Sequence, residues 1–342
     1  MSKSVFAAVG LTVLTAVAAQ AQGLSTPVCT STGTASQNVA QDACQQAYDI
    51  FQFMAPQLGL ALAGGNATLG QGSSLGGLGH FSVGIRGNVF NGVIPQIDQF
   101  TQRTSGATPA LVLPSKKQVL ALPTADAAIG LFGGLPFGLT NIGGVDLLVS
   151  ASYVPTIGDG NKDFSLKPKQ NLQLGYGVRV GLLSESIVVP GVSLTYLKRD
   201  LPSTTIAGSA SYTSGLGATT ASLTISDATV KTSAFRIVAS KSLIFFGFAA
   251  GVGQDTYKQS ANISANVTST LGGMTTTTVP NAYPDIKRTN AFFDASLNLP
   301  LFKLVGEVGQ VSGGTVNTYN SIGSSRADRS LTYGSVGLRL SL

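Results

Sequence analysis

Few side chains in this sequence have the type and spacing that catalysis requires. A single histidine, His80, occurs in all 342 residues, so a Ser-His-Asp triad would have to use it. The sequence lacks the phosphate-binding motif G-x-G-x-x-G. We therefore expect no enzyme activity, no catalytic residue and no cofactor.

A metal site is not indicated either. Residues 159–163 alternate oxygen ligands as a calcium loop does, but the glycine at the sixth place and the glutamate at the twelfth are missing. We interpret this segment as a turn. The two cysteines, Cys29 and Cys44, are too far apart for a reactive C-x-x-C pair and have no histidine nearby. We expect them to form a disulfide bond in an exported protein.

The N-terminus predicts that export. Lys3 gives a positive start, residues 5–19 are apolar, and Ala19-Gln20-Ala21 is a small-x-small cleavage site. Residues 1–21 are therefore interpreted as a signal peptide. The rest divides into an N-terminal plug or connector at 22–79 and a barrel at 80–342.

The N-terminal part contains one expected helix. Apolar residues recur from Ser36 to Ala55 at steps of three and four, which is helical spacing: Val39, Ala43, Ala47, Ile50 and Met54. Ser36 is the expected N-cap, and Pro56 is expected to end the helix. Residues 59–79 are rich in glycine, so we expect an extended, closely packed connector there.

After His80 the apolar residues alternate with polar or small ones. Residues 171–182 are the clearest case, because every second residue is apolar and the others are mainly Asn, Gln, Gly and Arg. The chain is 43% hydrophobic and only 11% charged, and after the N-terminus no apolar run reaches the roughly 20 residues of a membrane helix. The sequence therefore predicts an all-β membrane protein, an antiparallel transmembrane β-barrel of about 10 strands (range 10–14) with a short N-terminal helical plug.

The connections between these strands predict the orientation. Those near 184–188, 241–243 and Pro300 are short, whereas those at 92–123, 156–169, 200–229, 259–285 and 312–329 are long and polar. Short periplasmic turns and long outer loops are typical of outer-membrane barrels. Residues 200–229 could also contain a further hairpin, either above the membrane or as two more spanning strands.

Strand parity places several charged side chains in the lumen. Positive and negative charges are nearly equal in number among them, which favours mutual neutralisation over an ion-selective ring. The predicted lumen charge network consists of Arg86, Asp126, Asp146, Arg179, Arg236, Asp294, Glu307 and Arg339, with Lys303 on the same side. A net charge of +6 without a clustered basic stripe argues against a nucleic-acid partner.

Three features together resemble the FadL-type family of hydrophobic-compound transporters. They are the helix with Cys29 and Cys44 at its start, the glycine-rich connector from Ala63 to Gly72, and the barrel that fills the rest. The last ten residues resemble the C-terminal insertion signal of Gram-negative outer-membrane barrels, with Leu342 in place of the usual phenylalanine. The resemblance implies a bacterial outer-membrane protein that is inserted by the barrel-assembly machinery, contacts outer-membrane lipid and takes up hydrophobic compounds.

Three functions remain open from the sequence: uptake of hydrophobic or small solutes, a passive porin, and a structural or surface-interaction barrel. We favour uptake, because an unusually apolar stretch occurs in the expected outer loop at 109–122. The residues expected to admit a hydrophobic small-molecule ligand are Leu111, Val112, Leu113, Val119, Leu120 and Leu122.

Overall fold

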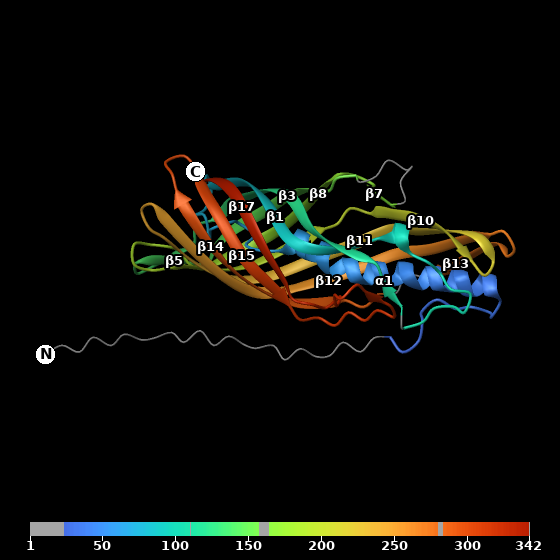
Figure 1. Ribbon diagram of the computed structural model, residues 1–342. Helices are drawn as coiled ribbons and strands as arrows, with labels where there is room; N and C mark the ends of the chain where they lie inside the picture. Colours follow the sequence, from blue (N-terminus) through green and yellow to red (C-terminus); the bar gives the residue numbers. More distant parts are fainter. Residues whose placement is uncertain (1–23, 110, 157–163, 280–282, 342) are drawn as a thin grey trace.

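The fold is a closed antiparallel β-barrel with one N-terminal helix (Figure 1). The computed structural model describes residues 24–341 except 110, 157–163 and 280–282. The expected signal peptide and the segment at 159–163 thus lie outside the described residues. Within the described part, ten strands pair in a ring in the order β1-β3-β6-β8-β9-β11-β12-β14-β15-β17, and β17 pairs with β1. The predicted fold class is confirmed.

The ten barrel strands differ greatly in length. They are β1 (Phe81–Pro95), β3 (Ser115–Phe132), β6 (Gly144–Tyr153), β8 (Leu172–Leu183), β9 (Gly191–Asp200), β11 (Gly217–Ser242), β12 (Phe246–Ser269), β14 (Ile286–Asn298), β15 (Lys303–Ser312) and β17 (Leu331–Ser341). We call the end of the barrel where β1 begins the short-turn end, since β8–β9, β11–β12 and β14–β15 are joined there by a few residues. The opposite end is the long-connection end.

Two of the barrel strands continue beyond the barrel at the long-connection end. The outer parts of β11 and β12 pair with β10 (Thr204–Ser214) and β13 (Gly273–Val279), and β10 pairs with β7 (Phe164–Pro168). We call these five paired segments the extension sheet; it lies at the right of Figure 1. The connections expected at 200–229 and 259–285 are therefore largely strand, and the further hairpin lies beyond the barrel and adds no strand to its wall.

The remaining elements are short. They are η1 (Ile97–Gln99), β2 (Val112–Leu113), β4 (Leu135–Phe137), β5 (Thr140–Ile142) and β16 (Ser321–Ile322). β4 and β5 form a hairpin at the short-turn end, and β2 pairs with β16 at the long-connection end.

The helix α1 (Ala35–Ala63) runs from the extension sheet into the barrel (Figure 1). Its first half packs on β11, β12 and β13, and Thr34 caps it by accepting a hydrogen bond from Gln37 N. The expectations that Ser36 is the N-cap and that Pro56 ends the helix are wrong. Pro56 removes one helical hydrogen bond, but the surrounding wall holds the next two turns, where Gly59 lies directly against the Tyr257 ring.

The two faces of the barrel wall have opposite polarity. Outward-facing Tyr176, Val178 and Phe235 are 59%, 39% and 45% exposed, whereas inward-facing Arg179 and Arg236 are buried. Such a wide apolar exterior is stable when lipid covers it. No helix of the described residues is long and apolar enough to span a membrane.

Candidate functional site

Buried ion pairs line the lumen. Arg179 Nε lies 2.8 Å from Asp146 Oδ2, and both side chains are almost completely buried. Asp126 bridges two strands, with Oδ2 at 2.9 Å from Arg86 Nε and Oδ1 at 2.6 Å from Arg199 Nη2. A fourth pair joins Arg236 to Asp255 at 2.5 Å. Arg179 and Arg236 are thus each paired with one carboxylate, whereas Arg86 and Arg199 share Asp126.

The same arginines also hold the main chain that follows the helix. Arg199 Nη1 donates to Leu62 O at 3.2 Å, and Arg236 Nη2 donates to Ala63 O at 3.0 Å. These carbonyls belong to the last helical turn, whose oxygens have no partner within the helix. Further along, Arg86 donates to Asn66 O at 2.5 Å and Arg339 donates to Leu69 O at 2.7 Å. Four wall arginines therefore contact residues 62–75, which we call the plug segment.

Wall carboxylates accept from the plug segment in return. Glu307 accepts from Asn66 N at 2.7 Å, Asp294 accepts from Gly70 N at 2.8 Å, and Asp146 accepts from Leu75 N at 3.1 Å. An irregular chain inside a barrel must find partners for its backbone polar groups. The wall charges supply them, so these side chains hold the plug segment in place.

Gly65 in the plug segment must be glycine. Its φ of +84° is in the left-handed region, and a Cβ there would lie 2.0 Å from Glu307 Oε1. The glycine-rich composition of this segment thus permits the close contact between the plug segment and the wall.

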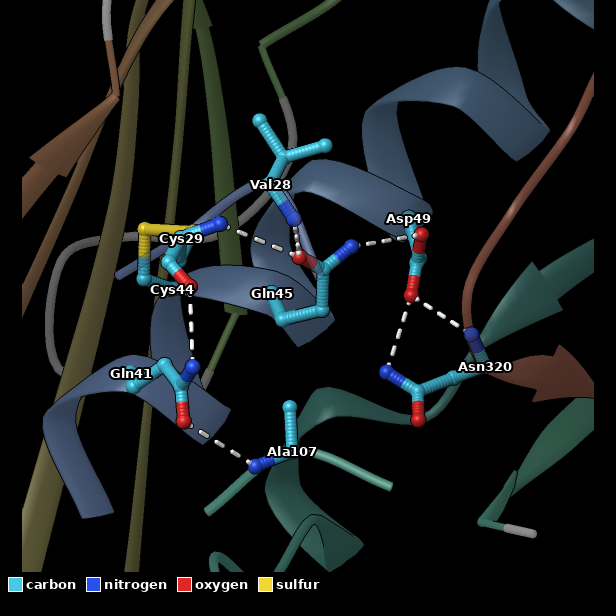
Figure 2. Close-up of a disulfide and its surroundings, with 8 residues drawn as sticks. All are labelled: Val28, Cys29, Gln41, Cys44, Gln45, Asp49, Ala107 and Asn320. Carbon is cyan, nitrogen blue, oxygen red and sulfur yellow. Dashed lines mark hydrogen bonds between the residues drawn. A yellow bond between two sulfur atoms is a disulfide. The ribbon is translucent and has the colours of Figure 1, made fainter. Parts of the chain in front are cut away.

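A second anchor holds the other end of the helix (Figure 2). Cys29 and Cys44 are joined in a disulfide with a Cα–Cα distance of 6.1 Å. Gln45 Oε1 accepts from Val28 N at 2.6 Å, and Gln41 Nε2 donates to Cys29 O at 2.9 Å. Asp49 accepts from the main chain and side chain of Asn320, both at 2.8 Å. The disulfide and these bonds tie the helix to the long connections.

Two buried carboxyls in this half of the helix have raised pKa values. Burial raises the pKa of Asp49 to about 7, although N–H groups of Asn320 and Tyr319 oppose the shift. Burial likewise raises the pKa of Asp42 to about 6, although the hydrogen bond from the Arg103 backbone N–H opposes the shift. The helix is therefore held by groups that titrate near neutral pH.

The expected hydrophobic admission site does not form one surface. Residues 115–132 are strand β3, so Val119, Leu120 and Leu122 belong to the barrel wall, and the expected loop at 92–123 is much shorter. Val119 is 63% exposed, whereas Leu122 faces inward and is 7% exposed. Leu113 is buried beneath the helix with Leu111 packed beside it, and Val112 faces solvent. Strand alternation separates these six side chains.

An apolar groove lies elsewhere, on the outer wall across β1, β3 and β6. Its volume is about 700 Å³. Small residues at Gly87, Pro123, Ala125 and Ala151 form the groove, and larger apolar residues flank it: Ile85, Tyr153, Leu172, Leu304, Val336 and Leu338. Lumen-facing Arg86 and Thr124 also line it, so only the backbone of two strands separates groove and lumen.

In the described barrel wall, sequence reasoning missed three buried charges: Arg199, Asp255 and Arg288. Arg199 and Asp255 complete two of the lumen ion-pair groups. Continued alternation past residues 196 and 252 could have found them, since both have the inward parity of their strands. Of the predicted network, Asp294 and Glu307 face each other across β14 and β15 with no cation within 4.0 Å in the described structure. The described residues contain no cluster of His, Cys, Asp and Glu that could hold a metal ion.

Comparison with known proteins gives structural neighbours only. No family model and no curated protein matches the chain. The transport unit of the autotransporter AIDA-I from Escherichia coli is 9% identical, with 88% of this chain and 99% of that chain covered and a TM-score of 0.30. The Pseudomonas putida toluene transporter TodX is 11% identical, with 80% and 96% covered and a TM-score of 0.33. Values this low carry no conclusion about what the chain does. The fold itself is a ten-stranded membrane barrel whose described lumen holds a helix and a clamped plug segment.

Proposed function

We propose that this protein is a bacterial outer-membrane barrel that takes up small hydrophobic compounds from the lipid side, with its plug segment as the gate. The groove across β1, β3 and β6 carries this proposal. It faces lipid, it is lined by apolar and small side chains, and its volume of about 700 Å³ is that of a small-molecule site.

The lumen supports a gated channel better than a passive porin. A porin needs an open polar pore, whereas here the wall charges bond to residues 62–75 from several strands. Hydrogen bonds and ion pairs of this kind can be exchanged for water, so a segment held by them can be released. A compound in the groove would reach the lumen only if the plug segment moves and the wall opens, because β1 pairs with β3 and β3 with β6 along the groove.

Filling the groove tests the proposal. Gly87 faces the groove and has no atom within 4 Å of an added Cβ, so Gly87→Leu should fill it without a clash. Gly306 is an outward glycine with the same free space and does not line the groove, which makes Gly306→Leu the matched control. Naphthalene binding to the purified protein should weaken at least tenfold in Gly87→Leu and stay unchanged in Gly306→Leu. Equal affinity in both variants would reject the groove as the binding site.

The extension sheet favours a second candidate, a surface-interaction barrel. β11 has 26 residues and β12 has 24, whereas β6 has only 10. A channel alone does not need strands of that length. If naphthalene binds neither variant nor the unmodified chain, display of the extension sheet outside the membrane is the better account.

A further inference from the structure

A polar cavity lies at the short-turn end of the barrel, away from the apolar groove. Its volume is about 490 Å³. We call it the vestibule. Ser73 and Ser74 of the plug segment line one side, and Lys303 of β15 and Arg339 of β17 line the other.

The two cations of the vestibule are direct neighbours. Lys303 and Arg339 are register partners on adjacent antiparallel strands. Like charges in this position destabilise a sheet. In the described part of the chain neither has a carboxylate within 4.0 Å. Asp294 and Glu307 form a second like-charged pair in the lumen, but Lys303 and Arg339 differ from them in lining a cavity that a ligand can enter.

Arg339 is also incompletely bonded. The residue is 5% exposed, and its Nη1 donates to Leu69 O at 2.7 Å. Its Nε has no acceptor among the described residues. A buried guanidinium N–H without an acceptor is costly. Arg86, Arg236 and Arg288 also have such N–H groups among the described residues, but Arg339 lines the vestibule, where a ligand can bring an acceptor.

A carboxylate that lines the vestibule is already in use. Glu185 lines the vestibule, but its oxygens accept from Ser240 Oγ at 3.1 Å and from the backbone N–H of Ser242. These bonds hold the β8–β9 connection against the end of β11. Glu185 therefore lowers the positive potential of the vestibule without pairing with Lys303 or Arg339.

We propose that the vestibule binds a small anion through a carboxylate or phosphate group held by Lys303 and Arg339. Arginine presents N–H groups in a geometry that matches both groups, and lysine adds a mobile point charge. Ser73 lines the same cavity, and its hydroxyl group can donate to a remaining oxygen. This site is independent of the apolar groove, and it stands whether or not the barrel takes up hydrophobic compounds.

Titration calorimetry of the full chain in neutral detergent with inorganic phosphate tests the site. Saturable binding is expected, and Lys303→Gln should weaken it about tenfold through the loss of one charge contact at short range. Glu185→Gln should tighten binding, since it removes the negative charge beside the cations. Lys117→Gln, at an exposed lysine of the long-connection end, should leave binding unchanged. Because Lys303 and Glu185 line an open cavity, both variants should fold even where a change at Arg339 does not.

Two outcomes overturn the proposal: no saturable phosphate binding by the unmodified chain, or equal affinities in Lys303→Gln and Lys117→Gln. Competition then separates the sources of the anion. Displacement of phosphate by phosphatidylglycerol micelles supports a lipid headgroup as the occupant, and displacement by butyrate but not by the lipid supports a free small anion.

Discussion

Replacing Arg236 with leucine should destabilise the barrel strongly, because it leaves a buried carboxylate without its cation. Asp255 lies 2.5 Å from Arg236, and its side chain is completely buried. Among the described residues it then keeps the Tyr257 hydroxyl at 3.3 Å and Asn290 Nδ2 at 3.2 Å as hydrogen-bond donors. Breaking a buried ion pair from one side costs about 3–5 kcal/mol. Arg236 also donates to Ala63 O, so the plug segment should loosen with it.

Removing both charges should cost much less than removing one. Arg236→Leu with Asp255→Leu leaves no uncompensated charge, and replacing a buried pair by apolar residues is often close to neutral. We expect the double variant to lose about 2 kcal/mol or less, which is smaller than either single loss. Lys258→Ala is the control, since its partner Asp285 is 3.8 Å away and both side chains are exposed; it should change stability by about 1 kcal/mol at most.

The chain contains no tryptophan, so unfolding is best followed by the fraction of fast-migrating folded barrel on gels after incubation in urea. The reasoning fails if the double variant loses as much as the sum of the two single variants. It fails equally if Arg236→Leu is no worse than Lys258→Ala.

Three further predictions concern the wall, the helix and the N-terminus. Val178→Arg on the lipid face should cost about 2–4 kcal/mol, while Gln173→Arg on the inward parity of the same strand should cost far less in the same gel assay; equal losses would contradict the assigned faces. The pKa of Asp49 is about 7 in the folded protein and its ordinary value is 3.8. The stability that Asp49 contributes is therefore full below pH 4 and is lost as the pH rises through 7. Between these two pKa values the free energy of unfolding falls by about 1.4 kcal/mol per pH unit. Hydrogen exchange of the first half of α1, corrected for intrinsic rates, should therefore show less protection at pH 7 than at pH 5. Asp49→Asn but not Asp98→Asn should reduce the difference, and Asp42→Asn with Asp49→Asn should remove it, since the pKa of Asp42 is raised to about 6; a pH dependence unchanged by Asp49→Asn would refute this role. Because α1 begins at the long-connection end, an epitope placed after Ser25 should bind antibody on intact cells, whereas one at Ile187 should bind only after the outer membrane is opened; the reverse pattern would invert the proposed orientation.

The barrel could be predicted from sequence because strand alternation is a local property. Every second residue in 171–182 is apolar, and the same parity that places Val178 outside places Arg179 inside. The inward side of Arg86, Asp126 and Asp146 follows from the same rule. Which charges meet does not follow from it. Arg199 on β9 reaches Asp126 on β3 along a row of register partners that passes Gly175 and Ser150, and that register is set by the pairing of four strands.

The extension sheet and the end of the helix depend on tertiary contacts. The outer parts of β11 and β12 are rich in Ser, Thr and Asn, a composition that loops share, and they are strands here because β10, β13 and the helix pack against them. Pro56 is a strong local signal for a helix end. The wall around Gly59 and the arginines that bond to Leu62 O and Ala63 O outweigh that signal.

Single-channel recording in planar bilayers tests most directly whether the plug segment closes the lumen. The intact protein should show almost no conductance. A chain lacking residues 24–75, shown by heat-modifiable mobility to be folded, should open discrete conductance steps, because both the helix and the segment that the wall charges hold are gone. High conductance in the intact protein, or a folded truncated barrel that stays closed, would contradict a lumen gated by its own N-terminal segment.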